Sequence, residues 1–365
     1  MKVYGLIAEF NPFHNGHKLF VDSIKQKYHP DVLIAVMSGN FVQRGDFAIL
    51  DKWDRAKLAV ELGVDLVIEL PVAYAVEPAE LFAKGAIKLL ETANIDTLVF
   101  GTEQQVDFDT IVKKISQVDG TFNQDYQQSS ALNLTNYYQS MGIDVSKLPN
   151  QLLGLNYVQQ IQKQALKINV QTIQRLPSDF SATKVRHRLA NNQSVTDLVP
   201  ELTQKLLVSR PTVTWNNYFP FFKYRITSSS VEELHQIYQM VEGLEYKLKK
   251  EIVTSDNFEQ FLEQVKSKRY TMARLRRLMI YVLLNVKADE INNVYKNTYL
   301  RILGFNKTGQ KYLNALKKSD VNLITRVGKK ENNILDLEIR ADRIRQLVTN
   351  QEENFGRMPY MKGVN

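Results

Sequence analysis

Residues 5–18 read G-L-I-A-E-F-N-P-F-H-N-G-H-K, and this stretch decides the fold. It joins an apolar run at residues 3–8, typical of a buried β-strand, to a helical pattern that begins at Gly16. Pro12 stops the strand from continuing, and Gly16 lets a backbone approach a bulky anion. Open α/β sheets bind ligands where a strand leads into a helix, and the free N–H groups of the helix favour phosphate. The stretch therefore predicts a phosphate-binding turn.

Further alternation of strand and helix patterns surrounds this turn. More strands are expected at residues 32–37, 65–70, 97–100 and 169–174. Helices are expected between and after them, at residues 16–28, 51–62, 78–92 and 181–190. Short apolar strands separated by amphipathic helices predict an α/β fold with a Rossmann-like parallel sheet.

The strand signals fade after residue 190. Helical patterns follow at residues 231–252, 257–266, 270–286, 288–299, 309–317 and 335–350. Residues 211–228, with the run F-P-F-F-K-Y-R-I, look extended or irregular. A chain of 365 residues usually divides into more than one domain. We therefore expect an α/β catalytic domain over residues 1–190 and a mainly α-helical domain over residues 191–365.

Charge is distributed unevenly between these two parts. Residues 1–190 hold 19 Lys+Arg against 20 Asp+Glu, whereas residues 191–365 hold 28 against 19. This excess of +9 favours a polyanionic partner, although a solvated basic surface gives the same count. The chain has no cysteine, which removes thiolate catalysis and Cys-ligated zinc. No apolar run is long enough for a membrane span or a signal peptide, so we expect a cytoplasmic protein.

Two histidines, His14 and His17, lie three residues apart at the phosphate-binding turn. Imidazoles that face the phosphates of ATP would stabilise the charge that develops on pyrophosphate during adenylyl transfer. The alternative is a pair of histidines that cap or pack the helix. A metal site is not expected, because zinc needs three or more ligands and no further His or Cys lies nearby. The chain also lacks a P-loop and the dinucleotide-binding glycine pattern.

The segment N-P-F-H-N-G-H resembles the H-x-G-H signature of the nucleotidyltransferase superfamily, which is related to class I aminoacyl-tRNA synthetases. More narrowly, a series of motifs resembles the tRNA(Met) cytidine acetate ligases in sequence and order. These motifs are E-F-N-P-F-H-N-G-H (9–17), M-S-G-N-F-V-Q-R-G (37–45), D-K-W-D-R-A (51–56), G-V-D-L-V-I-E-L-P-V (63–72), F-G-T-E (100–103), L-P-N-Q-L-L-G (148–154), S-A-T-K-V-R (181–186) and K-R-Y-T (268–271). The resemblance spans most of the chain.

That resemblance implies an activity. Enzymes of this family activate acetate with ATP as acetyl-adenylate, and then acetylate N4 of the wobble cytidine of elongator tRNA(Met). It also implies ATP as substrate, Mg²⁺ on the triphosphate, His14 and His17 as catalytic residues, and acetate and tRNA(Met) as partners. The implied ATP-binding residues are Ile7, Ala8, Glu9, Phe10, Asn11, Pro12, Phe13, His14, Asn15, Gly16, His17, Lys18, Leu19, Phe20, Gly101, Asn150 and Arg175.

Several of these positions have a direct physical interpretation. A side chain at Gly101, which follows a strand, would obstruct an adenine or ribose. Asn150 either caps a helix or bonds the nucleotide, and Arg175 either contacts phosphate or forms a surface salt bridge. The chain departs from the family at residues 176–180, where L-P-S-D-F replaces a Gly-rich segment with Tyr and His.

Ser181 and Thr183 follow at a helix start, where they either bind phosphate or cap the helix.

Two further segments are candidates for substrate contacts. Ser38, Asn40 and Arg44 follow a strand, so they either face the acyl group or the cytidine, or belong to an ordinary surface loop. In residues 266–277, Arg269, Arg276 and Arg277 are expected on one side of a helix, with an exposed Tyr270 to stack on a base. The alternative for this helix is a solvated polar face.

Two other functions stay open at this point. One is an adenylyltransferase that acts on a small metabolite, which would not need a basic second domain. The other is an RNA-binding protein that has lost catalysis, which the intact His14, Gly16 and His17 disfavour. The sequence indicates no particular oligomeric state.

Overall fold

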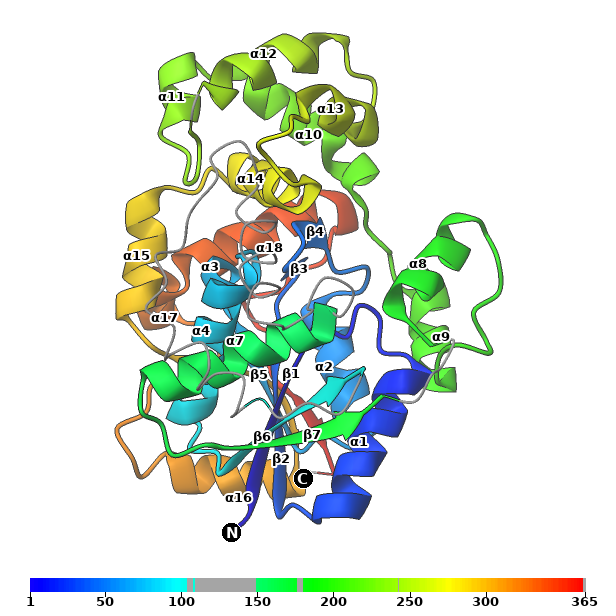
Figure 1. The fold of residues 1–365 in the computed structure, drawn as a ribbon, viewed down its shortest axis with the longest axis vertical. Helices are drawn as coiled ribbons and strands as arrows, with labels where there is room; N and C mark the ends of the chain where they lie inside the picture. The colour runs from blue at the N-terminus through cyan, green and yellow to red at the C-terminus, as the bar shows by residue number, and fades with distance from the viewer. Residues whose placement is uncertain (104–107, 109–148, 176–179, 242, 364–365) are drawn as a thin grey trace.

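The computed structural model describes residues 1–365 apart from 104–107, 109–148, 176–179, 242 and 364–365, and apart from the side chains of residues 149 and 150. Its centre is an eight-stranded sheet in the order β10-β8-β5-β2-β1-β6-β7, with β9 paired to β8 (Figure 1). The strands are β1 Val3–Ala8, β2 Val32–Ser38, β5 Leu66–Leu70, β6 Thr97–Thr102, β7 Asn169–Gln174, β8 Leu300–Asn306, β9 Leu323–Ile324 and β10 Tyr360–Lys362. A separate hairpin pairs β3 Phe41–Val42 with β4 Asp46–Phe47.

The five strands that the central sheet takes from before residue 190 pair in parallel, as the alternating pattern predicts. β1 lies beside β2 with Val3 opposite Val32 and Ala8 opposite Met37. Every residue of β2 is buried. Strands covered on both faces are expected to be continuous apolar runs rather than alternating ones, and this is why the sequence shows them clearly.

Helices cover both faces of this sheet. They are α1 Asn15–Tyr28, α2 Lys52–Glu61, α3 Val72–Ala75, α4 Ala79–Thr92, α7 Pro149–Lys163, α8 Ala182–Ala190 and α9 Glu201–Ser209. The apolar residues of α1, α2 and α8 belong to one core, and those of α4 and α7 belong to another. Asp51 caps α2 by accepting a hydrogen bond from the Asp54 N–H, as expected for an acidic residue at a helix start.

The second half of the chain is mainly helical, as predicted. Its helices are α10 Trp215–Ser228, α11 Val231–His235, α12 Leu244–Thr254, α13 Phe258–Val265, α14 Met272–Leu284, α15 Ala288–Lys296, α16 Lys307–Leu316, α17 Lys329–Ile334 and α18 Asp336–Thr349. Three short strands were not predicted there. β8 pairs antiparallel with β5, with Phe305 opposite Leu66, and β10 extends the sheet beyond β8. The sheet thus takes strands from both sides of residue 190, and the division at that residue remains a prediction.

Two predictions within the second half are wrong. Most of residues 211–228, expected to be extended, forms α10 with Pro220 inside it. Pro220 disfavours a helix at this position, but aromatic packing stabilises α10, because Trp215 and Tyr218 stack on Phe258 and Phe47 at 3.8 and 4.1 Å between ring centroids.

The single helix expected over residues 231–252 is broken into α11 and α12. Between them the Tyr238 N–H bonds the Val286 carbonyl, and Gly243 has φ +72°.

A buried network of charged side chains joins the two halves. Lys52 at the start of α2 donates to Glu69 of β5 at 2.8 Å and to Asp342 of α18 at 2.6 Å, and all three side chains are buried. Arg301 of β8 lies 3.3 Å from the same Glu69 carboxylate. Buried charges are stable only when they are paired, so these contacts fix α18 and β8 against the first half of the chain.

No helix in the described residues has both the length and the apolar character needed to cross a membrane.

Candidate active site

The turn after β1 is held by its own buried residues. Phe10 has φ +47°, the Asn11–Pro12 bond is cis, and α1 begins at Asn15. The Asn11 Oδ1 accepts a hydrogen bond of 2.9 Å from the Ile49 N–H, which ties the turn to the segment before α2. Asn11 therefore shapes the turn, whereas the resemblance implies that it binds ATP.

The two predicted histidines lie together at the start of α1. Their rings stack with 3.7 Å between centroids and 23° between planes. The His14 N–H donates a hydrogen bond of 3.2 Å to the Nδ1 of His17. In neutral His17 this acceptor role places the proton on Nε2, which leaves an N–H donor on the other side of the ring.

Both histidines are neutral at pH 7. Burial, followed by the charges of Arg175 and Arg186, lowers the pKa of His14 to about 4. Burial, with His14 and Arg175 beside it, also holds the pKa of His17 well below its ordinary value. The Nδ1 of His14 is buried and has no hydrogen-bond partner among the described residues. Because buried polar atoms are normally paired, this nitrogen is available to a ligand.

The prediction that these histidines cap or pack is therefore partly correct. His17 does bond the backbone of His14, yet the Nδ1 of His14 remains without a partner among the described residues.

Arg55 of α2 fixes the ends of two strands, and the sequence analysis did not single it out. Its guanidinium is fully buried and donates to the carbonyls of Glu9 at 2.7 Å and Ser38 at 2.9 Å, and also to those of Gly39 and Leu50. Burial lowers its pKa to about 10, so the group stays charged at pH 7. Arg55 belongs to the D-K-W-D-R-A motif that resembles the ligase family, but no role was predicted for it.

Glu9 and Arg186 form the polar border of the turn. The Glu9 carboxylate accepts the Gln43 N–H at 2.9 Å, and burial raises its pKa despite Arg186, Arg55 and Arg44 nearby. Arg186 of α8 donates to the Asn11 carbonyl at 2.6 Å. Arg186 belongs to a motif that resembles the ligase family, but no role was predicted for it.

The other predicted site residues differ in their contacts and exposure. A side chain on Gly101 would meet the Arg175 stem at 3.1 Å, so this glycine makes room for Arg175. The Arg175 side chain is exposed, and its charge acts on both histidines. Asn150 lies in the first turn of α7, as expected, but its side chain is outside the described residues, as are residues 176–179.

Within α1, Lys18 pairs with Asp22, and Leu19 is exposed. Ser181 caps α8 by accepting the Lys184 N–H at 3.2 Å, whereas Thr183 is exposed.

The segment after β2 is a packed hairpin and not an ordinary surface loop, which was one of the two alternatives for it. Asn40 is buried and donates to Asp342 at 2.8 Å and to Glu353, so it belongs to the charged network that joins the halves. Ser38 is also buried, whereas Arg44 is exposed. The Trp215 Nε1–H donates to the Gly45 carbonyl at 3.1 Å, which holds the hairpin against α10.

The arginine-rich helix does not present the face that was predicted. Arg277 is buried, with its Nη1 3.5 Å from the Gln43 carbonyl of the hairpin, and Arg276 is paired with Glu259 at 2.7 Å. Tyr270, expected to be exposed, is buried beneath the Arg274 guanidinium. Arg269 is exposed but precedes α14. The helix packs on the hairpin, so burial against other elements overrides the sequence pattern.

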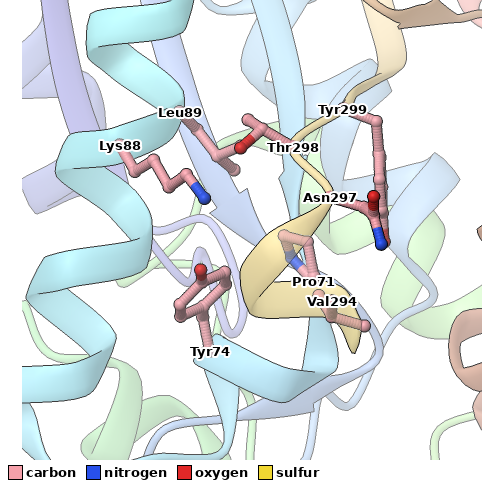
Figure 2. Close-up of a pocket in the computed structure, with 8 residues that line it drawn as sticks. All are labelled: Pro71, Tyr74, Lys88, Leu89, Val294, Asn297, Thr298 and Tyr299. Atoms are coloured by element: carbon pink, nitrogen blue, oxygen red, sulfur yellow. The ribbon is translucent and has the colours of Figure 1, made fainter. Parts of the chain in front are cut away.

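A small pocket elsewhere does not belong to this site. Figure 2 shows its lining residues, which are Pro71, Tyr74, Lys88, Leu89, Val294, Asn297, Thr298 and Tyr299. None of the predicted ATP-binding residues lines it. The cavity offers about 10 Å³ to the centre of a water molecule, which is room for about one water, so a nucleotide is not expected there.

The described residues contain no cluster of three or more His, Cys, Asp or Glu side chains that could hold a metal ion.

Comparison with known proteins shows the family of this chain. The family model for the HIGH Nucleotidyl Transferase matches residues 1–358. A tRNA(Met) cytidine acetate ligase from Lactobacillus delbrueckii subsp. bulgaricus is 38% identical and covers 98% of this chain and 99% of its own length. One from Listeria monocytogenes is 37% identical over 96% of each chain. The chain belongs to the tRNA(Met) cytidine acetate ligase family.

The crystal structure of Thermotoga maritima TmcAL bound with alpha-thio ATP has the same fold. It superposes with a TM-score of 0.84, at 28% sequence identity, over 99% of this chain and 100% of the other. The fold class predicted from the sequence, a Rossmann-like sheet followed by helices, is confirmed for this tRNA(Met) cytidine acetate ligase family member.

Proposed function

We propose that this protein activates acetate with ATP and transfers the acetyl group to N4 of the wobble cytidine of elongator tRNA(Met). The observation that carries the proposal is the turn at His14 and His17, with an unpartnered buried Nδ1, in a chain of the tRNA(Met) cytidine acetate ligase family. The reaction has two steps, and the residues around the turn support the first of them.

In the first step, a carboxylate oxygen of acetate attacks the α-phosphorus of ATP, and the bond to the β-phosphate oxygen breaks. Pyrophosphate leaves with the electron pair, so negative charge grows on its oxygens. The positive end of the α1 dipole, the Nε2–H of His17 and the guanidinium of Arg175 are the groups that would stabilise this charge. A neutral imidazole still supplies one N–H donor, as His17 does through its Nε2–H.

In the second step, N4 of cytidine attacks the acetyl carbon of acetyl-adenylate, AMP leaves, and N4 loses a proton. The amino group is a poor nucleophile because its lone pair is delocalised into the ring, so the acetyl group must be activated first. The chain has no cysteine, so the acetyl group does not pass through a thioester on the enzyme. Acetyl-adenylate made from free acetate and ATP is the activated donor in this proposal.

Mg²⁺ fits this site only as an ion carried by the nucleotide. The described residues offer no metal-binding cluster, and Mg²⁺ is commonly held by substrate phosphates with one or two carboxylates. It would offset the charge of the triphosphate. Arg175 and Arg186 add positive charge at the same turn.

The proposal is tested by identifying the products of the reaction. Purified protein is incubated with labelled acetate, ATP and tRNA(Met), and the RNA is digested to nucleosides. We expect label in N4-acetylcytidine, together with AMP and pyrophosphate. Release of ADP, or label only when acetyl-CoA replaces acetate and ATP, would exclude this reaction. Adenylation of a small metabolite, the other candidate enzyme activity, would release pyrophosphate without labelling RNA.

A further inference from the structure

The excess positive charge of the second half lies in one short segment. Residues 191–295 hold 14 Lys+Arg against 12 Asp+Glu, and residues 331–365 hold 5 against 6. Residues 296–330 hold 9 against 1. Nearly all of the +9 excess therefore belongs to the segment that contains α16 and the start of α17.

The cations of this segment are almost all exposed. Arg301 is buried in the charged network, and the only acidic residue, Asp320, is exposed. The eight exposed cations, here called the basic patch, are Lys296, Lys307, Lys311, Lys317, Lys318, Arg326, Lys329 and Lys330. In the part of the chain that the structure describes, none of them forms an ion pair with an acidic side chain, whereas Arg276 of α14 does.

Packing of α16 fixes the direction of two of these lysines. Lys307 and Lys311 are four residues apart on one side of α16, and the exposed Lys318 lies in the turn that follows the helix. The opposite side is buried, and the Tyr312 hydroxyl donates to the Ala93 carbonyl at 2.7 Å. A side chain on Gly309 would collide with the Asp65 carbonyl, so the helix lies directly on the sheet. The lysine side must therefore face solvent.

The α16 part of the basic patch and the histidine turn lie at opposite ends of the strands of the sheet. The turn follows the carboxyl end of β1, whereas α16 starts beside the amino end of β5, where Asn306 donates to Asp65 at 2.7 Å. Figure 1 shows α16 across the lower end of the molecule, near the N-terminus. A strand of six residues such as β1 spans about 20 Å, so the two sites are separated by at least that order of distance.

The chemistry of the patch favours phosphodiester groups over bases or lipids. Among the described residues, no large hydrophobic side chain of segment 296–330 is strongly exposed. Base recognition uses aromatic stacking, and membrane-surface helices carry an exposed apolar side, so both are disfavoured. Lysines spread over several elements match the spaced charges of a nucleic acid backbone.

We propose that the basic patch binds the phosphate backbone of tRNA outside the anticodon loop, while the modified cytidine lies at the histidine turn. The inference rests on the proposed function for the identity of the RNA. Because the contacts are to phosphates, they supply affinity and orientation but no sequence recognition.

The test compares two triple variants with equal loss of charge. One replaces Lys307, Lys311 and Lys318 by Gln, and the control replaces the exposed Lys84, Lys205 and Lys250 by Gln. The Kd for full-length tRNA(Met) is measured from 50 to 300 mM salt. The patch variant should bind about 10- to 100-fold more weakly, with a salt slope reduced by about two to three. The control should match the wild type.

Two further measurements separate this proposal from the proposed function. Binding of an isolated anticodon stem-loop, which lacks the rest of the tRNA, should be nearly unchanged in the patch variant. Acetate-dependent exchange of pyrophosphate into ATP without tRNA should also be unchanged. If the wild-type protein shows no such exchange, the proposed acetate ligase function is wrong. The salt slope for full-length tRNA would still show whether the basic patch binds RNA.

Three outcomes would contradict binding of tRNA by the basic patch. One is an unchanged salt slope for full-length tRNA. Another is equal weakening for the stem-loop and the full tRNA. The third is binding to phosphatidylglycerol vesicles that is lost in the patch variant while tRNA binding stays normal, which would assign the surface to lipid.

Discussion

At the residue scale, the state of the histidine pair determines what the turn can do. With a pKa of about 4, His14 carries no charge at neutral pH, so the positive charge at the turn comes from Arg175 and Arg186. The histidines instead offer directed hydrogen bonds, with His17 oriented by the His14 backbone. Groups that are oriented before substrate binds need no rearrangement during the reaction, and this is the main source of electrostatic catalysis.

Replacing either histidine by Ala should lower the rate of adenylation by about 10²-fold or more, with a much smaller change in ATP affinity. The charge that they meet develops mainly in the transition state. Pyrophosphate exchange measures the rate, and ATP titration measures the affinity. His187→Ala, at an exposed histidine of α8, is the matched control and should be near normal. Normal exchange by His14→Ala and His17→Ala, with unchanged melting temperatures, would remove both from the mechanism.

The lowered pKa of His14 also affects stability. Between pH 6.5 and about 4 the unfolded chain binds a proton that folded His14 does not. The free energy of unfolding should therefore fall with decreasing pH over this range, by up to about 1.4 kcal/mol per pH unit from this residue. Urea unfolding of His14→Asn should show a flatter pH dependence than the wild type, while His187→Asn should not. Identical profiles for His14→Asn and the wild type would contradict a neutral, buried His14.

At the element scale, the contact between the β3–β4 hairpin and α14 connects the helical half to the turn. Gln43 of the hairpin donates its N–H to Glu9, and its carbonyl faces Arg277. Gly45 has φ +74°, and a side chain there would collide with the backbone of Arg276 and Arg277. The hairpin can lie this close to α14 only because the residue at position 45 has no side chain.

Gly45→Ala and Gly356→Ala form a matched pair that tests this contact. Both glycines have nearly the same positive φ, but a side chain on Gly356 would meet nothing within 4 Å. Gly356→Ala should cost about 1 kcal/mol of unfolding free energy from backbone strain alone. Gly45→Ala should cost roughly 2 kcal/mol more, because the helix must also move. Equal losses in urea unfolding would show that the close approach is unimportant.

The sequence predicted elements whose signal is local and missed those decided by distant contacts. The bounds of β1 and β7 match the prediction because apolar runs and turns mark their ends. α10 was missed because Pro220 is a strong local signal against a helix, while the aromatic stacking that stabilises α10 involves distant residues. β8 was missed because one short apolar run among helices resembles a helix fragment.

The same distinction holds at the site. The histidine turn was predicted because strand, proline, glycine and helix follow one another in sequence. Arg55 and Arg186 were not predicted to act there, since their hydrogen bonds to the turn span 46 and 175 residues. The burial of Arg277 also depends on a hairpin more than 230 residues away. A helical pattern cannot distinguish a buried arginine from a solvated one.

At the scale of the whole molecule, the sheet and the charged network make the two halves depend on each other. A fragment of residues 1–190 would leave Lys52 without Asp342 and would expose the edge of β5 that β8 covers. Removing one partner of a buried ion pair costs about 3–5 kcal/mol, and an open sheet edge promotes aggregation. We expect the fragment to be partly unfolded or aggregated, as measured by circular dichroism and size-exclusion chromatography. A monomeric fragment with native-like melting would show that residues 1–190 fold independently.

The pairing of β8 with the much earlier strand β5 also affects folding during synthesis. Leu66 pairs with Phe305, so the neighbour of β5 emerges from the ribosome more than 230 residues after it. Contacts between residues so far apart in sequence form slowly, because a long loop must close first. The nascent protein must therefore keep the open edge of β5 from pairing with other chains until β8 has emerged. This makes the growing chain a natural client for chaperones that bind unfinished sheets.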